Sequence, residues 1–401
     1  MRESRVRLGL FFAGNVLFGA GLFFHAFLYN FYLEALGQNE VVMGLAAASL
    51  TAGGLIALIP AGRSVDRVGT QITLLSASVL AAVGLALGAW AERAFAIYAA
   101  AFVAGLGTVT WRVAMGPVVM ELAPARFRSQ AFSWNVALLV GSGAVWMTTA
   151  GALAGWLERN VGVTQLGAQR LALLAGVIGT AAAAPLFALA GRRVRMRGAS
   201  PEDGSVVGNA RGPDRALVRQ YAGPIAAVAL WMLAPALALP FFNLFFSRVH
   251  ELPVDRIGLV FGASHVATAL VIFTSGIFAA RLGARRVLTV WTCTFGPLLW
   301  ALGFAHLLPL ALGLYFLQGI VSPAANPLID EILLERAPPE RRGLVSSWRN
   351  AATEVAGIVG AGVGGLVLRQ SSFDALFVLA GTLGAVAAAA LWIVLKRSSR
   401  S

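Results

Sequence analysis

The sequence has few charged residues and a single cysteine. Asp, Glu, Lys and Arg together make up 12% of its 401 residues, whereas 58% are hydrophobic. A soluble core of this length could not hide so much apolar surface, so the composition excludes a soluble domain and predicts an integral membrane protein. Cys293 stands alone, which excludes an internal disulfide and a cysteine-based metal cluster, and we expect it to be a small packing residue within a span.

The sequence also lacks a Walker-type phosphate loop, a cluster of metal ligands and a nucleophile with a positioned base. ATP-driven transport and enzyme chemistry are therefore not indicated, and we expect neither a cofactor nor a metal. The formal net charge of +13 comes from loop arginines at the membrane surface. We therefore expect membrane lipids, and not nucleic acid, among its partners.

Long apolar segments recur along the whole chain. Each is close to the roughly 20 residues that a helix needs to cross a bilayer core of about 30 Å. The fold class that they predict is an all-α polytopic membrane protein with twelve transmembrane helices. The predicted spans are 7–32, 42–61, 71–91, 94–120, 130–156, 169–190, 220–247, 256–280, 286–305, 308–334, 344–368 and 373–395.

The loop arginines predict that both termini are cytoplasmic, because basic residues in short loops resist translocation. In that orientation the opposite side keeps only Arg93, Arg159, Arg170, Arg248, Arg256 and Arg369. The N-terminal residues run directly into an apolar stretch without a small-residue cleavage pattern, so we interpret it as an uncleaved first span. We expect a multi-pass protein of the bacterial inner membrane.

The two halves of the chain superpose at a fixed offset of 214 residues. Corresponding residues include Gly62 with Gly276, Arg67 with Arg281, Gly69 with Gly283, Glu121 with Glu335, and Arg128 with Arg342. A duplicated six-helix unit predicts a binding cavity between two pseudo-symmetric bundles. We predict an N-terminal bundle over 1–191, a cytoplasmic linker over 192–219 and a C-terminal bundle over 220–401, in a chain that acts as a monomer.

Two loop patterns extend this interpretation. The loop after span two contains G-x-x-x-D-R-x-G, and the loops after spans four and ten contain E-x-x-P-x-x-x-R. Their charged and glycine positions are Gly62, Asp66, Arg67 and Gly69, then Glu121 with Arg128, and Glu335 with Arg342. In a duplicated twelve-span chain these patterns resemble the major facilitator superfamily of transporters. The resemblance covers nearly the whole chain and implies two six-helix bundles around a central cavity that opens to each side in turn.

The resemblance also implies that the loop charges pair across the cytoplasmic face in one closed state. The implied pairs are Asp66 with Arg126 or Arg128, and Arg281 with Glu335. The second copy has Ala280 where Asp66 would map, so a latch there must use other residues. Two patterns of the family's proton-driven drug exporters, R-x-x-Q-G in span four and G-P in span five, are missing. Their absence weakens an assignment to that subfamily.

Ionisable residues at membrane depth are costly, so each is a functional candidate. Arg112 in span four could anchor a substrate or neutralise a carboxylate; the alternative is a fixed salt bridge between helices. Glu354 in span eleven is the deepest carboxylate, and we expect it to bind the coupling proton and to pair with Arg112 in one state. Asp330 and Glu331 match the depth of Arg349 on the next helix, which favours a structural pair over a coupling role.

Histidines and uncharged polar residues complete the candidate site. His25 in the outer part of span one either senses protons or bonds to a neighbour. His265 aligns with Thr51 in the repeat and His306 is expected near the outer surface, so neither is assigned a role. Further cavity candidates, for which ordinary packing is the alternative, are Asn15, Tyr29, Asn30, Trp111, Trp231, Asn243, Gln318 and Asn326.

The leading functional hypothesis is a proton-coupled secondary transporter that exports a small amphipathic organic solute by alternating access. Glycine-rich stretches in spans five and eleven would let helices approach and slide. The sparse polar lining favours a partly apolar solute. Uptake of a sugar, organic acid or other nutrient is one alternative. The other is a scaffold that keeps this fold without transport, against which Arg112 and Glu354 argue.

Overall fold

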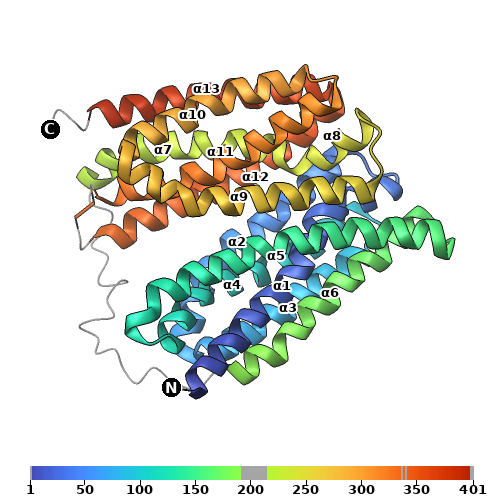
Figure 1. Ribbon diagram of the computed structural model, residues 1–401, viewed down its shortest axis with the longest axis horizontal. Coiled ribbons are helices and arrows are strands. Elements are labelled where there is room, and N and C mark those ends of the chain that lie inside the picture. The colour runs from blue at the N-terminus through green and yellow to red at the C-terminus, as the bar shows by residue number, and fades with distance from the viewer. Residues whose placement is uncertain (1, 191–214, 336, 339–340, 398–401) are drawn as a thin grey trace. The chain divides into compact units, whose positions relative to one another are not determined.

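The structure is a computed structural model that describes residues 2–190, 215–335, 337–338 and 341–397. Thirteen α-helices and no strand occupy the described residues (Figure 1). The helices are α1 (Arg2–Ala35), α2 (Glu40–Val68), α3 (Thr70–Trp90), α4 (Ala94–Leu122), α5 (Arg128–Trp156), α6 (Gln165–Ala190), α7 (Arg215–Ala238), α8 (Phe242–Arg248), α9 (Val254–Leu282), α10 (Ala284–Gly303), α11 (Leu308–Glu335), α12 (Arg342–Gln370) and α13 (Phe373–Arg397).

The twelve predicted spans correspond to these helices one to one when α7 and α8 are taken as a single broken span. The break is the 3-10 turn η4 (Leu239–Phe241), and it contains Pro240, which has no amide hydrogen with which to continue the helix. In the part of the chain that the structure describes, ten helical segments are long and apolar enough to cross a membrane. The predicted all-α, multi-pass membrane fold is confirmed.

The contacts within the chain define two compact units. Unit 1 comprises Met1–Arg195 and Pro240–Ala269, and unit 2 comprises Met196–Leu239 and Leu270–Ser401. The broken seventh span is therefore divided, because α7 belongs to unit 2 and α8 to unit 1. Most of the predicted linker, 192–219, lies outside the described residues, and the predicted domain boundaries stay a prediction.

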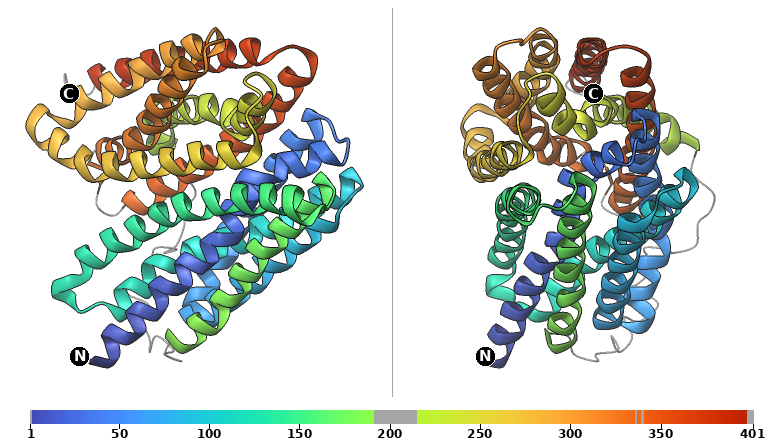
Figure 2. Two further views of the ribbon diagram at one scale, coloured as in Figure 1. Left: turned by 45° about the vertical axis from the view of Figure 1, so that its right-hand side comes forward. Right: turned by 90° about the vertical axis from the view of Figure 1, so that its right-hand side faces the viewer.

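Each unit has its own packing order. In unit 1, α1 packs on α5 and α6, and α4 packs on both α2 and α3 (Figure 2). Its core is aromatic, with Phe18 stacked on Trp111 at a centroid distance of 4.4 Å. In unit 2, α7 packs on α12 and α13, and α10 packs on α11 and α13. There Trp231 lies against Phe295 at 5.0 Å.

Many large apolar side chains point outward from the helices. Ile178 is 69% exposed and Ile59 is 67% exposed, as expected for surfaces that lipid covers. Cys293 is also exposed on α10. The prediction that Cys293 packs inside a span was wrong, because a helix that faces lipid on one side can leave a small apolar residue there.

The backbone repeats even where the sequence does not. Gly69 and Gly283 join consecutive helices in both halves, each with φ +87°. Gly37 has φ +74° and its repeat mate, Glu251, has φ +51°, a region that favours glycine. Gly62 lies within α2, so the predicted turn over Gly62–Gly69 is wrong in extent. Gly69 alone makes it.

In unit 1, α5 and α9 run antiparallel in close contact along a line of small residues. A Cβ atom added to Gly151 would lie 2.7 Å from the Val254 carbonyl oxygen, and one added to Gly258 would lie 2.9 Å from the Met147 carbonyl oxygen. Thr148 Oγ1 donates a hydrogen bond to the Gly258 carbonyl at 3.4 Å. We call this contact, between residues 143–151 of α5 and 254–265 of α9, the α5–α9 seam. Only residues without a Cβ let the two backbones approach this closely.

We expect Gly151→Ala to lower the thermal stability of the purified protein. The new methyl group would also lie 3.0 Å from Gly258 Cα, and such overpacking costs about 1–3 kcal/mol. The matched control is Gly141→Ala on the same helix, where an added Cβ has nothing within 4 Å. The melting temperature of the control should equal or exceed that of the unmodified protein. Equal melting temperatures for the two variants would contradict the seam.

Candidate functional site

A buried polar network joins α1, α4 and α5 in unit 1. Trp111 Nε1 donates a hydrogen bond to Asn15 Oδ1 at 2.9 Å, and Asn15 Nδ2 donates to Asn135 Oδ1 at 2.6 Å. Asn135 Nδ2 in turn lies 3.5 Å from Met115 Sδ. Two of the predicted candidates, Asn15 and Trp111, therefore satisfy each other, with 1% and 2% of their surface exposed. We call these residues the Asn15 network; its third member, Asn135, was not predicted.

The two predicted mid-membrane charges lie on helices of different units. Arg112 follows the buried Trp111 on α4 and is itself exposed. It lies ten residues before the end of α4, or about 15 Å along the helix axis. Glu354 is half-buried on α12, twelve residues after that helix begins, or about 18 Å along its axis. Pairing between them stays a prediction.

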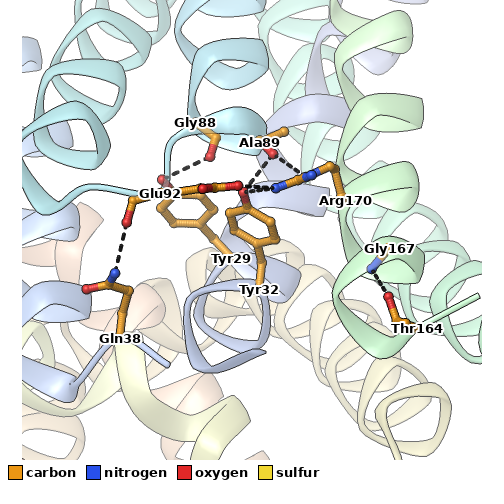
Figure 3. Close-up of polar contacts among 9 residues, drawn as sticks. All are labelled: Tyr29, Tyr32, Gln38, Gly88, Ala89, Glu92, Thr164, Gly167 and Arg170. Atoms are coloured by element: carbon orange, nitrogen blue, oxygen red, sulfur yellow. Dashed lines mark hydrogen bonds and ion pairs between the residues drawn. The ribbon is translucent and has the colours of Figure 1, made fainter. Parts of the chain in front are cut away.

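At the other end of unit 1, tyrosines of α1 and an arginine of α6 meet the last turn of α3 (Figure 3). Tyr32 Oη donates to the Ala89 carbonyl at 2.7 Å, and Arg170 Nε donates to the same oxygen at 3.0 Å. Tyr29 Oη lies 3.5 Å from the Gly88 carbonyl. The last carbonyls of a helix lack partners within it, so these side chains cap α3.

Two further contacts extend this cap. The Arg170 guanidinium lies 4.7 Å from the centre of the Trp90 ring and 3.4 Å from Glu92 Oε1. A cation at a helix C-terminus is also favoured by the helix dipole. The predicted candidate His25 stacks on Tyr29 at 4.0 Å. The structure thus places His25 and Tyr29 beside a structural cap.

Asn30 and Asn243, which the sequence offered as separate candidates, lie together in unit 1. Asn30 Nδ2 donates to the Pro240 carbonyl at 2.5 Å and lies 3.2 Å from Asn243 Oδ1. Asn243 Nδ2 donates to the Phe27 carbonyl at 2.8 Å. The amide of Asn30 thus binds a carbonyl oxygen at the helix break, which ties α1 to the start of α8.

A charged contact lies one to two turns further along the same pair of helices. Arg248 at the end of α8 binds Glu34 of α1 through Nε at 2.8 Å and Glu40 of α2 through Nη1 at 2.6 Å. We call these three residues, together with Asn30 and Asn243, the outer clamp. Neither Glu34 nor Arg248 was predicted as a functional residue. The sequence repeat could have indicated this ion pair, because Glu34 and Arg248 correspond at the 214-residue offset and have opposite charges.

The first copy of the loop motif lies at the end of α2 and the end of α4. The hydrogen bond found there is not one of the ion pairs that the family resemblance implies. Glu121 Oε2 accepts a hydrogen bond from Thr70 Oγ1 at 2.8 Å, which joins the end of α4 to the start of α3. Asp66 and Arg67 are exposed at the end of α2. The implied pairing of Asp66 with Arg126 or Arg128 stays a prediction.

The second copy of the motif lies in unit 2. Arg342 Nε donates to the Ala337 carbonyl at 3.3 Å. Arg281 is exposed at the end of α9, and the side chain of its implied partner, Glu335, lies outside the described residues. Nearby, Arg349 Nε lies 2.8 Å from Asp330 Oδ1. Asp330 and Arg349 thus form the ion pair that their matched depth predicts, and a structural in place of a coupling role for Asp330 stays a prediction.

Three uncharged side chains of unit 2 have buried polar atoms without a hydrogen-bond partner among the described residues. They are the Trp231 Nε1 hydrogen on α7, and both amide atoms of Gln318 and the Asn326 Oδ1 atom on α11. Trp231 and Gln318 are 0% and 1% exposed. An unsatisfied buried polar group costs about 1–3 kcal/mol, so these three residues, which we call the unpaired polar set, could hydrogen-bond to water or a solute. Among the described residues, no three His, Cys, Asp or Glu side chains lie close enough to hold a metal ion.

We expect Asn15→Leu to destabilise the protein strongly. The change would leave the Trp111 Nε1 hydrogen and the Asn135 Oδ1 atom unpaired in the core, at a cost of about 1–3 kcal/mol each. The measurement is thermal unfolding in detergent. The exposed Asn160, which bonds only to the Trp156 carbonyl at 3.2 Å, provides the control Asn160→Ala, with an expected change within about 0.5 kcal/mol. A melting temperature for Asn15→Leu close to that of the control would contradict the network.

Sequence comparison links the chain to one family. The family model of the Major Facilitator Superfamily matches residues 221–401. Over 184 residues the chain is 28% identical to the Multidrug export protein EmrB of Haemophilus influenzae. The matched part covers 43% of this chain and spans only 36% of the length of that relative.

Solved structures of transporters share the fold over almost the whole chain. The nucleoside transporter NupG superposes with a TM-score of 0.79 at 14% identity, covering 99% of this chain and 100% of that one. A D-xylose-proton symporter superposes with a TM-score of 0.77 at 17% identity, covering 96% of each chain. Identities this low establish the fold alone. Residues 221–401 thus match the Major Facilitator Superfamily model, and the chain as a whole shares the fold of these transporters.

Proposed function

We propose that the chain is a proton-coupled exporter of a small, partly apolar organic solute that works by alternating access. The observation that carries the solute class is the unpaired polar set. In unit 1, the candidates Asn15, Trp111 and Asn135 already satisfy one another. In unit 2, Trp231 and Gln318 are buried without a partner among the described residues. We assign these groups of unit 2 to the solute site.

The chemistry of the unpaired polar set limits what it could hold. Trp231 offers one donor, Asn326 Oδ1 offers one acceptor, and the Gln318 amide offers both. A solute with two or three hydrogen-bonding groups on an apolar frame matches this supply. A sugar, with a hydroxyl on nearly every carbon, would leave most of its groups unpaired, and each unpaired group weakens binding.

Glu354 is the proposed proton-binding residue. It is the carboxylate farthest from a helix end in the described chain, and an ionisable group at membrane depth is costly unless it has a role. Arg112 is the proposed counter-charge or solute anchor. A scaffold that does not transport would gain nothing from keeping two ionisable residues at this depth.

The direction of transport rests on the sequence relative. The protein of Haemophilus influenzae that matches part of this chain is described as a multidrug export protein, which supports export. The nucleoside transporter and the D-xylose-proton symporter are the reason to keep uptake of a nutrient as the second candidate. The loop arginines support cytoplasmic termini in a bacterial inner membrane. We further propose that the transporter acts as a monomer among anionic lipids.

We expect Glu354→Gln to abolish solute flux driven by a pH gradient in proteoliposomes. Glutamine keeps the size and polarity of the side chain but cannot exchange a proton. The assay follows internal pH with a dye while lipophilic cations, neutral amphipathic compounds, pentoses and nucleosides are added in turn. The control is Glu331→Gln, an exposed carboxylate on α11, which should leave flux unchanged. Proton movement at the native rate in Glu354→Gln would disprove the coupling role, and flux of pentoses or nucleosides alone would favour uptake.

We expect Trp231→Phe and Gln318→Leu to reduce the stabilisation that a transported solute gives the purified protein. A ligand at one hundred times its Kd stabilises the folded state by about 2.7 kcal/mol. Each substitution keeps most of the side-chain volume and removes only hydrogen-bonding groups. Trp156→Phe, at a tryptophan of α5 that is 52% exposed, is the control and should keep the full shift. An unchanged shift in both unit 2 variants would remove the unpaired polar set from the solute site.

A further inference from the structure

His265 lies on α9 where the α5–α9 seam ends. It is eleven residues after the start of that helix, or about 16 Å along its axis. Its ring meets the Phe23 ring of α1 edge-on at 5.5 Å. On the α5 side it occupies space that only glycine leaves free, because a Cβ added to Gly143 would lie 2.6 Å from His265 Cδ2.

The hydrogen bond of His265 fixes which ring nitrogen can take up a proton. Nδ1 lies 3.1 Å from the Phe261 carbonyl oxygen, which can only accept, so Nδ1 carries the hydrogen. Nε2 then holds the lone pair, and no hydrogen bond to Nε2 occurs within the described residues. Since Cδ2 is bonded to Nε2, this edge of the ring is the one that faces Gly143. A proton can therefore be added at Nε2 without breaking the bond to Phe261.

Comparison of His265 with its repeat mate shows how the imidazole differs from the residue at the equivalent position. The repeat mate of His265 is Thr51, and Thr51 Oγ1 donates to the Ala47 carbonyl at 3.0 Å. Ala47 is itself the repeat mate of Phe261. Both side chains thus make the same bond to their own helix, four residues back. The imidazole differs from the hydroxyl by its larger volume and by one further nitrogen that can be protonated near neutral pH.

At His265 the contact between α5 and α9 changes from backbone against backbone to side chain against backbone. From Gly151 to Ala144 on α5, the neighbours on α9 are backbone atoms or glycine: a Cβ added to Gly262 would lie 2.7 Å from the Ala144 carbonyl oxygen. One turn further along α9, the contact passes through the His265 ring instead. A neutral ring fits between Gly143 and Phe23. A charged ring needs water or an acceptor for its second N–H, and neither glycine nor phenylalanine provides a side-chain acceptor.

The helices α1 and α5, whose residues contact the His265 ring, bring few charges near it. On α1, the nearest titratable residues to Phe23 along the chain are His25 and Tyr29, which stack on each other. On α5, the only ionisable residue is Arg128, fifteen positions from Gly143. On α9 itself, Asp255 and Arg256 lie nine to ten residues before His265, and Arg281 lies sixteen after it. His265 is therefore the ionisable group at this level of the seam.

We infer that His265 is a proton site that controls the separation of α5 and α9. With Nε2 neutral, the ring closes the end of the seam. With Nε2 protonated, the helices move apart at this level so that water reaches the new N–H group. This inference goes beyond the proposed coupling at Glu354, because it needs neither a solute nor a proton gradient.

The test is the distance between α5 and α9 as a function of pH in the purified full-length protein. Spin labels are attached to cysteines at Val145 and Val266, which are 60% and 48% exposed, after the native Cys293 is replaced by serine. Pulsed electron paramagnetic resonance measures the label distance at about pH 5 and about pH 8, on either side of the usual histidine pKa of about 6.5. We expect a longer distance at the lower pH, by about 2 Å, the scale of a helix shift.

Substitution of His265 tests whether this residue is the cause. His265→Thr restores the residue and the bond of the repeat mate, and His265→Gln is the second variant should the first not fold. In either variant the label distance should be the same at both pH values, whereas His25→Gln should keep the full change. A constant distance in the parent protein, or an unaltered pH response in the two His265 variants, would overturn the inference. These outcomes are independent of Glu354→Gln transport, which tests coupling alone.

Discussion

The hydrocarbon core of a bilayer offers no hydrogen-bond partner, and the polar groups of this protein are arranged around that constraint. Helices satisfy the backbone over their whole length. Side chains bind the backbone carbonyls that have no partner within a helix. Tyr32 and Arg170 bind a carbonyl in the last turn of α3, and Asn30 binds the Pro240 carbonyl at the break before α8. Buried amide and indole groups without a hydrogen-bond partner among the described residues are the exceptions, and they include Trp231 and Gln318 in unit 2 and Gln169 in unit 1. Function is inferred from these exceptions.

Hydropathy was sufficient to predict the membrane-spanning helices, since the thickness of the bilayer fixes the length of an apolar helix that crosses it. The break of the seventh span was not predictable in the same way. Pro60 and Pro117 lie within unbroken helices, whereas Pro240 lies in a 3-10 turn. A proline alone therefore does not decide whether a membrane helix breaks. At this break the Pro240 carbonyl accepts a hydrogen bond from Asn30, which is more than two hundred residues away in the chain.

The sequence could predict which helix carries each candidate residue, but it could not predict which of these residues contact one another. Periodicity places Asn30 and Asn243 on their helices but does not say that they meet. The repeat held more information than conserved positions alone: repeat mates of opposite charge, Glu34 and Arg248, bind each other. The sequence analysis gave His265 no role on the ground that its repeat mate is a threonine. Both residues bond to their own helix, and the difference lies in one additional nitrogen.

The strength of the outer clamp is compatible with the proposed transport, which requires a change of state. Its ion pairs are partly exposed, with 32% of the Arg248 side chain accessible, so each is worth at most about 1 kcal/mol. Its amide hydrogen bonds add about 0.5–1.5 kcal/mol each. The total is a few kcal/mol, the usual difference between two conformations of such a protein. One proton can offset it, because a group whose pKa differs by two units between states contributes about 2.7 kcal/mol. A clamp of many strong bonds would hold one state permanently, whereas this one can yield to a single protonation.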